Sequence, residues 1–258
     1  MTADGTNGNG NGGNVPGREA TRPQLPRRFY KDVSVEATDD GHRVLLDGRP
    51  VKTPKKLELA VPQAALAEAM ADEWRAQGEL IDPETMPLTK LVNTALDAVT
   101  GQEEAVAADI AAYAGSDLTC YRAEHPTELV AQQARAWGPI LAWARDALGT
   151  EFVLTEGIMP VAQSTDALEA VAQNVARFNA LQLAGLHVMT TLTGSALIAL
   201  AHAHGQLPAE AAWAAAHVDE DYQISQWGDD EEARERRKRR WAEFQAASRL
   251  LGFVHEGG

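Results

Sequence analysis

The strongest constraint on the fold is a change of hydrophobic periodicity near Pro62. Before this residue, apolar and polar residues alternate, as they do around Leu57, Leu59 and Val61, and this alternation is typical of half-buried strands. After it, apolar residues in segment 86–101 recur at intervals of three and four, which indicates an amphipathic helix. The chain is therefore expected to join a small β unit to a longer helical part.

The β unit is predicted to begin at Phe29. Its strands are expected in four short runs of apolar or alternating residues, namely 29–35, 44–46, 50–53 and 57–61. Asp39-Asp40-Gly41 and Asp47-Gly48 separate the first runs, and Asp-Gly readily adopts the positive φ angles that tight hairpin turns require. We expect three or four antiparallel strands.

Helices are predicted for the rest of the chain. In the first, Pro62 suits the first helical position, Leu66, Met70 and Trp74 recur every fourth residue, and Gly78 suits the end. In the second, Pro87 suits the start. Further helices are expected over 102–115, 126–148, 165–180, 182–204, 208–227 and 229–251, with an extended piece near 151–160.

The predicted fold class is α+β, with a small N-terminal antiparallel β-rich domain followed by a larger, mostly α-helical domain. Residues 1–26 contain six glycines and four asparagines without apolar periodicity, so we expect a disordered tail. The β-rich domain, with its one helix, is expected to span 27–80, and the helical domain 81–258.

Composition excludes several functions. The chain has 23 Lys+Arg against 37 Asp+Glu, a formal charge of −14, which argues against nucleic-acid binding. A single cysteine, Cys120, excludes an intramolecular disulfide and a zinc site made of several cysteines. Segment 178–209 lacks Asp, Glu, Lys and Arg, but polar residues such as Gln182 and His187 interrupt it, so we expect a buried helix and no stable membrane insertion.

No catalytic constellation is recognisable, and neither a cofactor nor a metal is expected. His202 and His204 lie two apart, too far round a helix to bind one metal ion together. A metal-dependent enzyme using His217, Glu220 and Asp221 stays open as an alternative. No glycine-rich phosphate-binding loop follows a strand.

Two charged patterns lie near the C-terminus. The basic run 234–240 follows four acids, and Asp230/Arg234, Glu232/Arg236 and Glu235/Arg239 are spaced for helical ion pairs, with Asp229 and Glu232 suited to cap the helix, so we expect a self-paired, solvated helix. On a single helix over 208–227, Glu220 would fall within the apolar stripe of Trp213, Ile224 and Trp227. Such a carboxylate must pair internally, have a raised pKa, or face another protein.

Six separated segments of this chain resemble one known family. In order, they are RFYKDVSV, LDGRPVKTP, DEWRAQGELIDPETMPLTKLVNTALD, LTCYRA, LTGSALIALA and AAWAAAHVDEDYQISQWGDDEEA. They are similar to the assembly chaperones that bind the free α subunit of the F-type ATP synthase head, and the likeness spans about residues 28–252. The resemblance implies a non-enzymatic chaperone that shields the subunit interface of α until the β subunit replaces it.

The resemblance also implies where the partner binds. It places contacts at Trp74, Glu220, Gln223, Trp227, Asp229 and Glu231. For Trp74 and Trp227, however, helical spacing by itself favours packing in the core. Because no presequence or signal peptide is recognisable, we expect a bacterial cytoplasmic protein, and we expect a monomer. A generic chaperone for many unfolded chains stays open as a second alternative.

Overall fold

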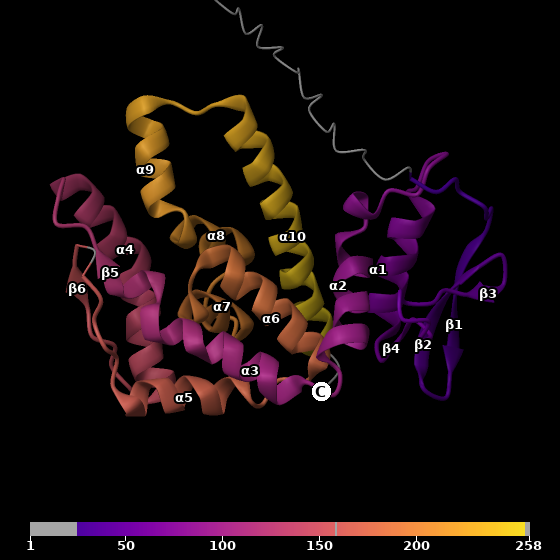
Figure 1. Cartoon of the computed structure of the whole chain (residues 1–258), viewed down its shortest axis with the longest axis horizontal. Coiled ribbons are helices and arrows are strands. Elements are labelled where there is room, and N and C mark those ends of the chain that lie inside the picture. Colours follow the sequence, from indigo (N-terminus) through magenta and orange to yellow (C-terminus); the bar gives the residue numbers. More distant parts are fainter. Residues whose placement is uncertain (1–24, 158, 256–258) are drawn as a thin grey trace, which may run out of the picture.

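The structure, a computed structural model, describes residues 25–157 and 159–255. Nearly all of the predicted tail, residues 1–24, lies outside this part of the chain. Within it, a small antiparallel sheet with one covering helix lies beside a larger set of helices, as Figure 1 shows. The predicted α+β fold class is confirmed; the exact domain boundary at residue 80 stays a prediction.

The N-terminal sheet has β2 at its centre. Its strands are β1 (Val33–Thr38), β2 (Gly41–Leu46), β3 (Arg49–Pro50) and β4 (Ala60–Val61), and β1, β3 and β4 all pair with β2 in antiparallel orientation. Between β2 and β3, Asp47 and Gly48 have φ angles of 48° and 76°, the left-handed conformation predicted for this turn. Gly41 is also required, because a Cβ atom there would lie 2.5 Å from the carbonyl oxygen of Val61.

Helix α1 (Ala64–Arg75) covers the sheet. It packs against β1 and β2 through side chains that include Leu66 and Met70, both fully buried. The hydroxyl of Tyr30 donates to the carbonyl of Trp74 at 2.7 Å, which fixes the end of the helix to the segment before β1. The helix begins two residues after Pro62, so the predicted start was early, and it ends at Arg75, before Gly78.

Helix α2 (Pro87–Thr94) begins at the predicted proline, after the short helical turn η1 (Pro83–Thr85). The carboxylate of Glu73 on α1 accepts from the backbone N–H groups of Leu88 and Thr89 at 2.8 and 2.7 Å. Free N–H groups at a helix start need such acceptors, so α1 caps α2. The helix continues into a wider turn, η2 (Ala95–Val99).

The remaining helices form the larger part of the molecule. The long ones are α3 (Glu103–Ala112), α4 (Thr127–Trp143), α5 (Thr165–Val175), α6 (Ala180–Thr193), α7 (Ala196–Ala203), α8 (Ala209–Ala216), α9 (Val218–Trp227) and α10 (Glu231–His255). Short helical turns are η3 (Tyr113–Ser116), η4 (Leu118–Cys120) and η5 (Ala144–Leu148). Two short parallel strands, β5 (Tyr121–Arg122) and β6 (Thr155–Glu156), pair beside α4, and β6 lies in the predicted extended piece.

Two predicted helices are each divided in two. The segment predicted as 182–204 breaks at Gly194, whose φ of 67° ends α6, and the Ser195 hydroxyl then accepts from the N–H of Ile198 to start α7. The segment predicted as 208–227 breaks at His217, whose φ and ψ of −114° and 17° are not helical. The single-helix predictions were wrong at these points.

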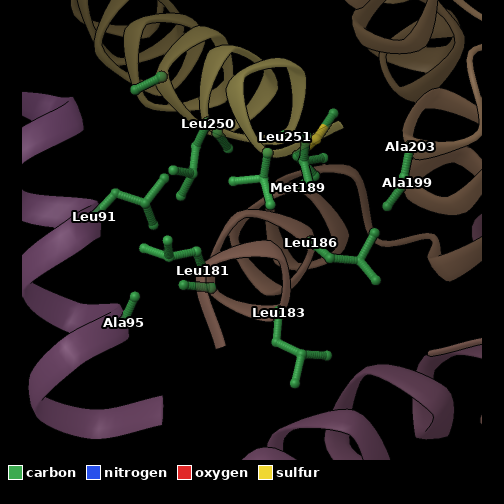
Figure 2. Packing of buried hydrophobic residues seen from close by; sticks show 14 of the residues in the cluster. Leu91, Ala95, Leu181, Leu183, Leu186, Met189, Ala199, Ala203, Leu250 and Leu251 are labelled. Carbon is green, nitrogen blue, oxygen red and sulfur yellow. The ribbon is translucent and has the colours of Figure 1, made fainter. Parts of the chain in front are cut away.

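The hydrophobic core is centred on α6. Figure 2 shows Leu181, Leu186 and Met189 of α6 on the sides that face α2, α7 and α10, whereas Leu183 points to the opposite side of the helix. At Gly185 an added Cβ atom would lie 3.3 Å from the carbonyl oxygen of Ala247 on α10, so a small residue is needed for this close approach. The prediction of a buried helix is confirmed, and no helix in the described ranges has both the length and the apolar character to cross a membrane.

Candidate functional site

The end of α9 and the start of α10 carry most of the residues predicted to bind a partner. Glu220, Gln223 and Trp227 follow one another on α9 at intervals of three and four, so they share one face of the helix. Asp229 lies in the connection after Gly228, and Glu231 is the first residue of α10. These five residues are called the α9–α10 surface below.

Trp227 is the most exposed large apolar side chain among those in the described part of the chain, at 79% of its possible surface. The prediction that it packs in the core was wrong. The cause is the break at His217: Trp213, on α8, is buried at 9%, whereas Trp227 stands at the far end of the next helix. A lone exposed tryptophan is unusual on a surface that contacts only water.

Glu220 does not lie in a buried apolar stripe. Its side chain is 43% exposed, and its carboxylate oxygen Oε2 lies 3.7 Å from Nε2 of His217. The expected conflict between a carboxylate and an apolar environment is therefore absent at this residue. Glu220 is accessible to a partner instead.

Trp74 lies apart from the α9–α10 surface. In Figure 1, α1 stands on the other side of α10 from α9. Its ring is half-buried and packs edge-on against Tyr30, with the ring centroids 5.8 Å apart. Trp74 thus packs against the edge of the core, so its predicted core packing is confirmed only in part. The six predicted residues do not form one continuous site.

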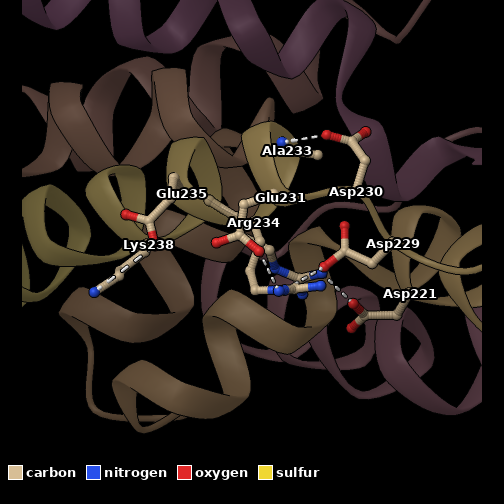
Figure 3. A network of polar contacts seen from close by, with 9 residues as sticks. Asp221, Asp229, Asp230, Glu231, Ala233, Arg234, Glu235 and Lys238 are labelled. Carbon is tan, nitrogen blue, oxygen red and sulfur yellow. Dashed lines mark hydrogen bonds and ion pairs between the residues drawn. The ribbon is translucent and has the colours of Figure 1, made fainter.

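Ion pairs hold the α9–α10 surface in shape (Figure 3). Arg234 binds Asp229 at 3.2 Å and Glu231 at 2.7 Å, so one guanidinium fixes the connection to the first turn of α10. Arg237 binds Asp221 at 2.5 Å and so joins α10 to α9. Figure 1 shows the two helices standing apart otherwise, with the connection across their ends. The sequence pattern did not predict the ion pair between Arg237 and Asp221, because the two residues lie on different helices.

The predicted pairing within α10 is confirmed only in part. Glu232 and Arg236 lie 3.7 Å apart as expected, but Glu235 approaches Lys238 instead of Arg239. Asp230 accepts from the N–H of Ala233 at 2.8 Å and is therefore the capping residue in place of Asp229.

The base of α9 is built around His217. Nδ1 donates to the carbonyl oxygen of Trp213 at 2.7 Å, and the two rings stack with centroids 3.9 Å apart. Burial lowers the pKa of His217 below its ordinary value, so the ring is neutral at neutral pH. Asp219, next along α9, accepts from the amide of the buried Gln133 at 2.7 Å, which fixes α9 to α4.

These contacts also bear on the metal-enzyme alternative. Asp221 is turned toward Arg237 and away from His217 and Glu220. Among the residues with described positions, no group of three His, Cys, Asp or Glu side chains is placed to hold a metal ion. His202 contacts the carbonyl of Leu207, and His204 contacts Asn174.

Known proteins resemble this chain in sequence and in structure. The family described as ATP12 chaperone protein matches residues 27–145. The Atu1473 protein of Agrobacterium tumefaciens, whose crystal structure is known, is 47% identical, with a TM-score of 0.85 over 89% of this chain and 87% of that one. Atp12 of Paracoccus denitrificans is 39% identical, with a TM-score of 0.83 over 88% of this chain and 98% of that one. Protein atp12, mitochondrial, of Schizosaccharomyces pombe is 25% identical over 221 residues, which cover 81% of this chain and 76% of the yeast protein.

Proposed function

This chain belongs to the ATP12 chaperone family, and on that premise we propose that it binds the free α subunit of the F-type ATP synthase through the α9–α10 surface. The bound chaperone shields the face that α later presents to the β subunit, and β displaces it. No enzymatic step is part of this proposal. An unassembled subunit exposes a large apolar face, which promotes aggregation until it is covered.

The exposure of Trp227 is the observation that supports the site. An aromatic side chain with little internal contact gives a large apolar area at low entropic cost, and such residues dominate binding energy at protein interfaces. Glu220 lies on the same face of α9, and Asp229 and Glu231 follow Trp227 closely in the chain. The expected partner surface is therefore an apolar pocket with basic residues at its rim.

The surface is also held in place before any partner binds. Arg234 and Arg237 fix the acidic side chains of the connection and of α9, and Gln133 fixes α9 to α4. A pre-formed surface loses less entropy on binding than a disordered one. The binding energy of Trp227 is thus available for the partner.

Capture of separately expressed α subunit tests the proposal. The protein is mixed with α, with β and with an unrelated aggregation-prone protein, and soluble complexes are measured by size exclusion with light scattering. We expect a complex with α alone, lost when β is added. Capture of the unrelated protein to the same extent would support a generic chaperone instead, and no capture of α would refute the proposal.

Substitutions then locate the binding surface. Trp227→Ala is expected to weaken capture of α by more than tenfold, which corresponds to the loss of about 2 kcal/mol typical of a central aromatic contact. Glu220→Lys is expected to weaken it as well, by reversing one charge of the surface. The matched controls are Phe29→Ala, which removes a second exposed aromatic side chain on the N-terminal unit, and Glu169→Lys on α5. Equal loss in the controls would remove the α9–α10 surface from the proposal.

We also place this function in the bacterial cytoplasm and expect a monomer. Two of the similar proteins come from bacteria, whereas the yeast relative is named as mitochondrial. Light scattering of the purified chain measures the oligomeric state directly, and a dimer would contradict that part.

A further inference from the structure

A groove with a volume of about 500 Å³ runs along α4, away from the α9–α10 surface. One wall is α4 itself, and the other is formed by β5 and the extended segment before and within β6. We call it the α4 groove; its main lining residues are Arg122, Val130, Gly138, Leu141, Phe152 and Leu154.

Regularly spaced residues line both walls of the groove. Val130, Ala134, Gly138 and Leu141 follow at intervals of four, four and three, so they lie on one face of α4. On the opposite wall, Phe152, Leu154 and Glu156 alternate, as the inward-facing residues of an extended segment do. The groove is thus mostly apolar and open along its length.

Gly138 leaves open space in the α4 wall of the groove. It lies in the interior of α4, where glycine destabilises a helix relative to alanine, and Pro139 follows it. An added Cβ atom at Gly138 would meet no atom within 4 Å. Packing therefore does not require glycine here, and the residue leaves open a space that any side chain would enter.

Arg122 supplies an unpaired charge in this apolar setting. Its guanidinium carbon lies 4.9 Å from the ring centroid of the buried Trp137, and its Nε atom is buried without a hydrogen-bond partner. It forms no ion pair with any residue whose position is described. Burial also lowers the pKa of Arg122, and no carboxylate is among the groups that oppose this effect.

We propose that the α4 groove binds a short apolar segment of a partner protein, with a carboxylate of that segment bound to Arg122. Arginine holds carboxylates with paired, directional hydrogen bonds, and the Trp137 ring already contacts this guanidinium. Glu151 and Glu156 also line the groove and repel further carboxylates and a densely anionic membrane surface, so the bound segment carries a single carboxylate, directed at Arg122. This inference goes beyond the proposed function, because it concerns a different surface and an acidic partner segment.

Fluorescence anisotropy with two labelled peptides tests the inference. The first peptide is amphipathic, about four helical turns long, with leucines on one face and one glutamate beside them. The second replaces this glutamate with lysine. We expect the full-length protein to bind the glutamate peptide about tenfold more tightly than the lysine peptide, because charge-assisted hydrogen bonds to Arg122 are lost in the second.

Two variants separate binding from folding. Arg122→Gln is expected to remove most of the preference for the glutamate peptide. Gly138→Leu is expected to prevent binding of both peptides by filling the groove, while its melting temperature equals or exceeds that of the wild type, since a better helix former replaces glycine. Arg135→Gln is the matched control, because Arg135 is an exposed cation of α4 that does not line the groove. It should leave both affinities unchanged.

Several results would overturn the inference. These are equal affinity of the wild type for the two peptides, no binding of either peptide at about 1 mM, and undiminished binding by a folded Gly138→Leu protein. Vesicles of phosphatidylglycerol and phosphatidylethanolamine are a further probe. Binding to these vesicles that Gly138→Leu abolishes, without peptide binding, would assign the groove to lipid instead.

Discussion

At the scale of single residues, Asp117 shows how a buried charge joins distant parts of the helical region. Its carboxylate is fully buried and accepts from the hydroxyls of Ser195 and Thr119 and from the backbone N–H groups of Thr119 and Leu197. Burial raises its pKa, and the four hydrogen bonds oppose that effect. Asp117 thereby ties the chain before β5 to the start of α7.

Removal of this carboxylate should be costly. Asp117→Ala would leave four donors without their acceptor in the core, so we expect the free energy of unfolding to fall by more than about 2 kcal/mol. Urea unfolding followed by circular dichroism measures it. Asp72→Ala is the control, because Asp72 forms only an exposed pair with Arg75 and should change stability by less than about 1 kcal/mol. Equal losses in both variants would contradict this account of Asp117.

The buried His217 should make stability depend on pH. Its pKa is lowered by burial and by Arg237 and Arg240, against the opposing effects of the Trp213 carbonyl and Glu220. The unfolded chain therefore binds a proton at His217 at a higher pH than the folded protein does. Stability is fully present above the ordinary pKa of 6.5 and is lost as pH falls below it, toward the folded pKa.

His217→Phe tests that dependence. Phenylalanine keeps the ring stacked on Trp213 but cannot bind a proton, and it leaves the Trp213 carbonyl unpaired. We expect a protein that is less stable than wild type at pH 8 and whose free energy of unfolding changes less between pH 7 and about pH 5. An unchanged pH slope in a folded variant would show that His217 is not the titrating group.

At the scale of elements, Gly194 sets the boundary between α6 and α7. Its φ of 67° lies in the left-handed region, which residues with a Cβ atom rarely adopt. Gly194→Ala should therefore lower the free energy of unfolding by about 1 kcal/mol, even though its added Cβ would meet no atom within 4 Å. Gly115→Ala is the control in chemical denaturation, because Gly115 has neither a positive φ nor a close neighbour. A neutral Gly194→Ala would mean that the strain is relieved elsewhere.

The individual helices, strands and turns show which parts of the fold the sequence could predict and which it could not. The β2–β3 turn and the start of α2 were predictable, because Asp47-Gly48 and Pro87 act through local backbone preferences. The break at Gly194 has an equally local signal, a glycine followed by a capping serine, but the continuous apolar pattern around it favoured one long helix. β5 and β6 are too short for a periodic pattern, and their pairing joins residues far apart in the chain.

The candidate site was predicted less well than the fold, for a physical reason. Helical spacing tells which residues share a face, but not whether that face meets the core or the solvent, so Trp227 was assigned to the core. Its exposure depends on the turn at His217, which reorients the whole of α9. Arg237 and Arg122 gained their roles only from contacts with distant residues, Asp221 and Trp137.

At the scale of the whole molecule, α4 stands between the two surfaces proposed to bind partners. Its buried face includes Gln133, whose amide donates to Asp219 of α9 and whose carbonyl accepts from the N–H of Ala123 beside the groove. Trp137 donates to the carbonyl of Ala215 on α8. These contacts make α4 a shared support for the two surfaces.

We expect the two surfaces, although both are supported by α4, to bind their partners independently. Coupling between two binding sites requires two conformational states for which each ligand has different affinities. The two surfaces also prefer different partners, because the α9–α10 surface is expected to bind a basic surface and the α4 groove an acidic segment. The affinity of the glutamate peptide should therefore change by less than about twofold when the chaperone is saturated with captured α subunit, as measured by anisotropy. Trp227→Ala should leave peptide affinity unchanged, and Gly138→Leu should leave capture of α unchanged. Competition between peptide and α would mean instead that a segment of α itself occupies the groove, in which case Gly138→Leu would weaken capture as Trp227→Ala does.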